Sequence, residues 1–159
     1  LGLNDQGYWN TPAYNYRSSP TQVGTATNWS KVTNDQYGAV FAINTSGELW
    51  AWGSGGPGTL GLNESGPGAR YSSPVQVGTD TTWYSIYAEA YRVMATKTDG
   101  TLWTWGGNNY GELGHNDRFP AQYSSPTQLP GSWLASDGNT IEANREFGIN
   151  DRLGAALRE

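Results

Sequence analysis

Three groups of residues in this chain have types and spacings that could do chemistry. The run Gly53–Gly58 satisfies G-x-G-x-x-G, a pattern that cradles a dinucleotide pyrophosphate when a helix begins behind it. His115, the single histidine, stands two residues before Asp117, so the pair offers a general base with a carboxylate to orient it. Eight tryptophans and ten tyrosines offer large flat faces on which sugars can stack.

The chain also repeats itself at a period close to 53 residues. The segment 49–53, Leu-Trp-Ala-Trp-Gly, returns as Leu-Trp-Thr-Trp-Gly at 102–106. Ser-Ser-Pro-x-Gln stands at 18–22, 72–76 and 124–128, and a lone tryptophan follows each copy. Such a period marks a solenoid, a propeller or an array, in which one structural unit recurs.

Because of this repeat, the candidates for chemistry are interpreted as turns. The second copy of the glycine run, 106–111, has no helical pattern behind it, and neither has the first. Leu3 and Leu62 take the place of His115 in the other units, so this histidine is interpreted as a turn residue. The fourteen acidic residues are dispersed and cysteine is absent. The sequence therefore predicts no catalytic residue, no cofactor site and no metal site, and we expect no enzyme activity.

The elements that carry these residues are predicted to be short strands. The stretches 38–43 and 91–96 are expected strands, and the first is a continuous apolar run, as in a strand buried on both faces. Polar turns follow at 44–47 and 97–100, and the Asp-Gly pair of the second suits a two-residue hairpin. In the Leu-Trp-x-Trp frame the two tryptophans alternate with a small residue, so both point to one sheet face. No segment has sustained helical periodicity.

Composition narrows the classes of partner. The net charge is −5 and there are only two lysines, whereas non-specific nucleic-acid binding needs cations that neutralise phosphate. No apolar run of 18 residues exists, so no membrane span is expected. The expected partners are other protein subunits or copies of the chain itself, and, as a further possibility, a surface glycan. Nucleic acid is not among them.

The repeat resembles that of the regulator of chromosome condensation family. Its frame is Ser-Pro-x-Gln-Val, then Trp, then Asp-Gly-x-Leu-Trp-x-Trp-Gly, then Gly-x-Leu-Gly. Residues 72–114 match it almost position for position, and 18–61 match it with Ser46 in place of Asp. The family's frequent Gly-x-x-His element is missing after the lone tryptophans. The texture, rich in Ser, Thr, Asn and Gly and poor in Lys, resembles the phage and bacterial members rather than the eukaryotic exchange factor.

The resemblance implies an all-β fold, in which antiparallel sheets form consecutive β-propeller blades. Closed propellers have four to eight blades, so two full repeats plus partial ones make an incomplete or shared propeller. Residues 1–159 are then one repeat domain with four parts. These are 1–17, the end of a preceding unit with a long aromatic loop; 18–61, repeat one; 62–114, repeat two; and 115–159, a degenerate partial repeat three.

The first loop is longer than its counterparts and carries unrepeated aromatic residues, namely Tyr8, Trp9, Tyr14 and Tyr16. Insertions in single repeats often lie on a binding face, so these residues are candidate contacts for a partner or a glycan. Alternatively, they pack on a neighbouring blade or subunit.

Three functions are therefore open. The first is a non-enzymatic structural or interaction module of a phage virion appendage or bacterial surface assembly, with a virion or extracellular location. The second is a glycan-binding adhesin domain for host recognition. The third is an intracellular regulator of a GTPase or of chromatin, against which the acidic balance and the absence of the exchange factor's loops count.

Overall fold

The chain folds into two sheets that lie side by side. A computed structural model describes residues 19–64, 69–117, 122–131 and 133. The first sheet has the order β1-β2-β3-β4 and the second β5-β6-β7-β8, with every pairing antiparallel. The strands are β1 Trp29–Asn34, β2 Ala39–Asn44, β3 Leu49–Ser54, β4 Arg70–Gln76, β5 Trp83–Glu89, β6 Arg92–Lys97, β7 Leu102–Gly107 and β8 Gln122–Leu129.

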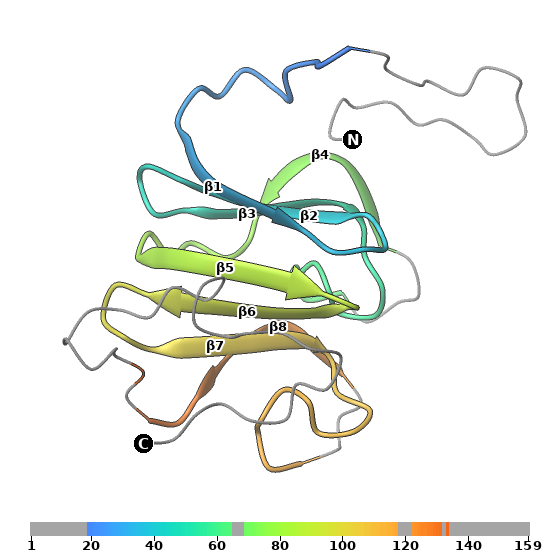
Figure 1. Cartoon of the computed structure of the whole chain (residues 1–159), viewed down its shortest axis with the longest axis vertical. Helices are drawn as coiled ribbons and strands as arrows, with labels where there is room; N and C mark the ends of the chain where they lie inside the picture. Colours follow the sequence, from blue (N-terminus) through green and yellow to red (C-terminus); the bar gives the residue numbers. More distant parts are fainter. Residues whose placement is uncertain (1–18, 65–68, 118–121, 132, 134–159) are drawn as a thin grey trace, which may run out of the picture.

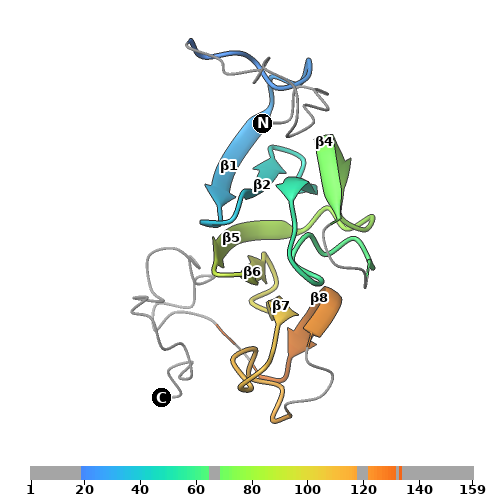
Figure 2. The ribbon, with the colours of Figure 1, turned by 90° about the vertical axis from the view of Figure 1, so that its right-hand side faces the viewer.

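Each sheet is one blade, and we call them blade 1 and blade 2. Figure 1 shows the blades stacked one above the other, and the view in Figure 2 shows the strands of each blade following one another outward from β1 and from β5. The expected all-β fold with antiparallel blades is confirmed. Pro74 and Pro126 lie in β4 and β8, the outer strands, where a missing N–H is tolerated.

One hydrophobic core joins the two blades. β5 lies against β1 and β2, and the buried cluster contains residues of both sheets, including Phe41, Ile43, Ile86, Val93 and Trp105. β2 is buried along almost its whole length, as its continuous apolar run predicts. The two blades therefore share one core.

The predicted two-residue hairpin between β6 and β7 is wrong. Lys97 donates its N–H to the carbonyl of Thr101, and Gly100 donates its own to the carbonyl of Lys97, both at 3.0 Å. Gly100 has a φ of +78°, whereas Asp99 has no positive φ. The loop is thus three residues long, a turn followed by a left-handed glycine. Asp99 serves the turn with its side chain, which accepts the N–H of Thr101 at 3.0 Å.

Consecutive units are joined by a repeated backbone contact. Trp83 donates its N–H to the carbonyl of Gly47 in blade 1, and Trp133 donates its own to Gly100 in blade 2, each at 3.1 Å. Trp133, the third lone tryptophan, is therefore hydrogen-bonded to blade 2 in the same way as Trp83, the second, is hydrogen-bonded to blade 1. The sheets run from 29 to 76 and from 83 to 129, so each takes its last strand from the following sequence repeat.

Candidate interaction surface

In each blade, the lone tryptophan and the two tryptophans of the repeat frame meet on one face. In blade 2, the ring of Trp83 lies 5.8 Å from that of Trp103 and 6.2 Å from that of Trp105, both edge to face. The alternation of the frame predicts this shared face. In blade 1 the lone tryptophan is Trp29. Its ring centre lies 6.0 Å from that of Trp50 and 6.2 Å from that of Trp52.

The tryptophan face of blade 2 packs against blade 1. Trp105 is fully buried, and its ring meets the ring of Phe41 edge to face at 6.3 Å. Its indole N–H donates to the carbonyl of Thr59, in the loop that leaves β3, at 2.9 Å. At Trp105, a tryptophan of the repeat frame thus packs between the two blades.

The equivalent face of blade 1 is open at Val32, whereas Trp52 on the same face is only 6% exposed. Val32 and Ile86 occupy the same repeat position, three residues after the lone tryptophan, yet Val32 is 71% exposed and Ile86 only 4%. Lys31 reaches over the ring of Tyr84 in blade 2, at 4.1 Å, so its neighbour Val32 points to the opposite side of the sheet. We call the half-buried Trp29 and Trp50, together with Val32, the open tryptophan face.

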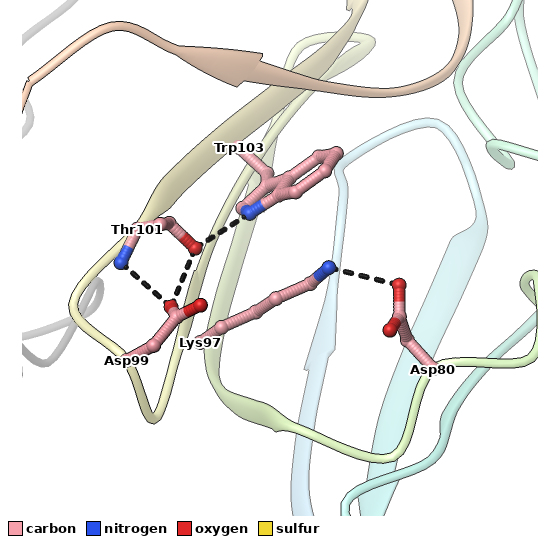
Figure 3. A network of polar contacts seen from close by, with 5 residues as sticks. All are labelled: Asp80, Lys97, Asp99, Thr101 and Trp103. Atoms are coloured by element: carbon pink, nitrogen blue, oxygen red, sulfur yellow. Dashed lines mark hydrogen bonds and ion pairs between the residues drawn. The ribbon is translucent and has the colours of Figure 1, made fainter.

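A buried lysine, Lys97, lies over two tryptophans of blade 2, and Figure 3 shows it beside one of them, Trp103. The ammonium of Lys97 is 3.8 Å from the ring centre of Trp103 and 4.6 Å from that of Trp83. The Asp80 carboxylate accepts a hydrogen bond from it at 2.8 Å. Trp103 is held from its other end, because its indole N–H donates to the hydroxyl of Thr101 at 2.8 Å. The ammonium of Lys97 is thus bound by two aromatic faces and one carboxylate.

The same network affects a titratable group on the turn. In Figure 3 the Thr101 hydroxyl lies between the indole of Trp103 and the carboxylate of Asp99, to which it donates at 2.7 Å. Hydrogen bonds from the hydroxyl and the N–H of Thr101 hold the pKa of Asp99 below its ordinary value. The β6–β7 turn thereby positions Trp103, whose ring contacts the ammonium of Lys97.

His115 and Asp117 contact different partners. Thr104 donates its hydroxyl to the carbonyl of Leu113 at 2.9 Å, so it accepts from Nε2 of His115 at 3.0 Å. Asp117 instead accepts from the Asn108 amide at 3.2 Å and from the Tyr123 hydroxyl at 2.9 Å. The interpretation of His115 as a turn residue therefore agrees with its contacts. In blade 1 an apolar pair, Ala51 and Leu62, stands where Thr104 and His115 form their polar pair.

This histidine gives the fold a predicted pH dependence. Burial lowers the pKa of His115, and the nearby Asp117 offsets this only in part. As the pH falls, the unfolded chain takes up the proton first, near the ordinary pKa of about 6.5. Stability is therefore lost from about pH 7 downward until the lowered folded pKa is passed. We expect the melting temperature to fall over this window, and to fall less in His115→Leu. A His115→Leu curve parallel to that of the wild type would contradict this.

The glycine run 53–58 belongs to the end of β3 and the turn behind it. Residues 57–60 form a turn, with Thr59 donating its N–H to the carbonyl of Gly56 at 3.1 Å. Because no helix follows this turn up to residue 64, the pyrophosphate site that the motif would need is not built there. The interpretation as a turn is confirmed.

Other predictions fall partly outside the described ranges. Tyr8, Trp9, Tyr14 and Tyr16 all lie outside the described residues, so their roles remain predictions. In the part of the chain that the structure describes, no group of three or more His, Cys, Asp or Glu could hold a metal ion. No helix within the same ranges is long and apolar enough to cross a membrane.

Two features of this surface, the buried Lys97 and the exposed Val32, are missing from the sequence-based predictions. The change from Asn44 to Lys97 introduces the only lysine of repeat two. Val32 and Ile86 are both apolar, and only the neighbouring blade makes their environments different. The first difference is visible in the sequence, whereas the second needs the packing of the sheets.

Fold and surface together define consecutive blades of a β-propeller. Residues 99–133 match the family model for the Regulator of chromosome condensation (RCC1) repeat. This segment therefore matches the RCC1 repeat, as its sequence frame predicts. The expected likeness to phage and bacterial members in particular remains a prediction.

Known proteins resemble the chain over its repeats. The RCC1 domain-containing protein RUG3, mitochondrial, of Arabidopsis thaliana is 41% identical over 83 residues, which are 49% of this chain and 19% of that protein. The probable E3 ubiquitin-protein ligase HERC6 of Homo sapiens is 29% identical over 83 residues, or 52% of this chain and 8% of the ligase. The chain thus spans less than a fifth of either relative.

A solved structure shows the same fold. Prp20p from Saccharomyces cerevisiae, described with its binding to Gsp1p and histones, superposes with a TM-score of 0.59 at 22% identity. The match covers 69% of this chain and 28% of Prp20p. The fold and the repeat identify this chain as consecutive β-propeller-like blades similar to the RCC1 repeat.

Proposed function

We propose that the chain is a non-enzymatic structural and interaction module that works inside a larger propeller or assembly. The observation that carries this proposal is the contrast between Val32, 71% exposed, and Ile86, 4% exposed, at one repeat position. Blade 2 stabilises its apolar face by burying it on blade 1. Blade 1 has the equivalent three tryptophans and Val32 on its own face, and large exposed apolar patches mark interaction sites.

We further propose that this assembly is a phage virion appendage or a bacterial surface structure, with a virion or extracellular location. The composition supports this, because the chain has only two lysines and many Ser, Thr, Asn and Gly residues. A net charge of −5 also favours protein partners over nucleic acid. Regulation of a GTPase or of chromatin is a weaker proposal, suggested by the partners named for Prp20p.

Glycan recognition is the second proposal. It rests on the length of the first loop and on its unrepeated aromatic residues, Tyr8, Trp9, Tyr14 and Tyr16. A glycan array with the wild-type chain and a Tyr8→Ala/Trp9→Ala variant tests it. Binding that the double variant abolishes would support the adhesin function, and an array without signal would exclude it for the glycans present.

The chain has no cysteine, so a single introduced thiol can report whether the open tryptophan face is covered. We expect Val32→Cys to react with maleimide quickly in dilute chain and at least about tenfold more slowly at concentrations where the chain associates. Tyr110→Cys is the control, because Tyr110 is 84% exposed on the β7–β8 loop and should react quickly throughout. Equal rates for both thiols at every concentration would contradict the proposed interface.

A further inference from the structure

The two blades differ at the residue that faces the lone tryptophan. In the β1–β2 ladder Trp29 pairs with Asn44, and in the β5–β6 ladder Trp83 pairs with Lys97. Asn44 and Lys97 are therefore equivalent positions at the end of the second strand of each blade. One carries a cation and the other carries a neutral amide.

In blade 2 the residue at this position, Lys97, places its ammonium in an aromatic cage formed by Trp83 and Trp103. The ammonium of Lys97 lies over both Trp103 and Trp83, at 3.8 and 4.6 Å from the ring centres. These two rings, inclined at 72° to each other, bind the cation through their negative faces, and tryptophan is the best residue for this contact. Blade 2 therefore shows what the paired rings of this repeat bind.

In blade 1 the cage is built without its cation. Trp29 and Trp50 meet edge to face at 6.0 Å and 86°, close to the 5.8 Å and 72° of the pair in blade 2. Asn44 turns back onto its own turn, where its amide oxygen accepts the N–H groups of Ser46 and Glu48, each at 3.0 Å. The described ranges place no lysine or arginine over either ring.

From this comparison, we propose that Trp29 and Trp50 form a binding site for an alkylammonium group, the lysine side chain of a partner protein. Glu48 stands in the place of Thr101, and its carboxylate accepts a hydrogen bond from the side-chain amide of Asn44, the residue that faces Trp29. Together with the net charge of −5, this carboxylate favours a cationic ligand.

A covering blade would leave the site reachable. Blade 1 already covers the tryptophan face of blade 2, yet a pocket of about 350 Å³ remains there, lined by residues that include Trp83, Trp103, Asp80 and Gln76. A blade packed on blade 1 in the same manner would leave the corresponding opening at Trp29 and Trp50. The cage and the packing of blades are therefore compatible.

This inference deepens the proposed function, since it names the chemistry of a partner group, but its test measures a small cation and does not depend on assembly. The probe is N-acetyl-trimethyllysine amide, with N-acetyl-lysine amide beside it. The control is the neutral isostere in which carbon replaces the ammonium nitrogen. We expect both cations to shift the indole N–H signals of Trp29 and Trp50 in NMR spectra. The isostere should bind about five- to thirtyfold more weakly than the trimethylated probe. Equal affinities for the charged and neutral probes would overturn the proposal.

Reciprocal exchange of the two positions sharpens the test. Asn44→Lys should fill the cage from within and abolish binding, while Lys97→Asn should open a second cage at Trp83 and Trp103. Lys97→Met is the matched control, because it removes the charge but keeps the volume, so it should gain no second site. Trp50→Leu should abolish binding even if Asn44→Lys does not fold. If folded Asn44→Lys or folded Trp50→Leu bound the trimethylated probe with the affinity of the wild type, the proposal would also be overturned.

Discussion

Replacing Trp105 by alanine is expected to lower the free energy of unfolding by about 3–5 kcal/mol, the range for deleting a large buried aromatic side chain. Trp105 is fully buried, and its ring packs on Trp83 within blade 2 and on Phe41 of blade 1. Its N–H also holds the carbonyl of Thr59 at 2.9 Å, and that carbonyl would lose its partner. One deletion therefore removes apolar contacts within a blade and between blades.

Chemical denaturation followed by circular dichroism measures this loss. Tyr110→Ala is the control, because Tyr110 is 84% exposed, and its change should stay within about 0.5 kcal/mol. Trp103→Ala should cost less than Trp105→Ala, since Trp103 is only half-buried. If Trp105→Ala and Tyr110→Ala had the same effect, the core between the blades would be misplaced.

Gly106→Ala is expected to cost about 2–4 kcal/mol, from left-handed strain together with overpacking. Gly106 has a φ of +101°, and a Cβ at this position would lie 2.0 Å from the carbonyl oxygen of Tyr91. The three nearest atoms are all backbone atoms of Tyr91 and Arg92, so no flexible side chain can move away. Gly53, the equivalent residue of blade 1, has a φ of +92° and an oxygen at 2.1 Å, so the repeat preserves glycine for the same reason.

The neighbouring residue provides the matched control. A Cβ on Gly107 would meet nothing within 4 Å, and this glycine has no positive φ. Gly107→Ala should therefore change stability by less than about 1 kcal/mol. Thermal unfolding of the two variants side by side compares them, and similar losses would show that the close approach at Gly106 has no energetic consequence.

Much of the fold follows from the repeat itself. The alternation in Leu-Trp-x-Trp-Gly places Trp103 and Trp105 on one face, because strand side chains alternate regardless of the partner sheet. The recurring lone tryptophan aligns Trp83 with Trp133, and both donate to a turn glycine of the blade before. These features depend on local pattern and period, which a single sequence contains.

What could not be predicted depends on contacts between distant segments. Asp-Gly is compatible with more than one hairpin, and the choice at Asp99 depends on its bonds to Thr101. The ion pair of Lys97 joins the end of β6 to Asp80 before β5. The exposure of Val32 depends on a neighbouring sheet, which no property of β1 records.

Sedimentation of the purified 159-residue chain tests the central claim, that the open tryptophan face of blade 1 must be covered, most directly. The account predicts species heavier than the 17.2 kDa monomer, and a shift towards the monomer when Val32→Glu places a charge on that face. Binding of an exposed-hydrophobe dye should rise as the wild-type chain is diluted and dissociates. A wild-type monomer of 17.2 kDa with a cooperative melt and no dye binding would contradict the account.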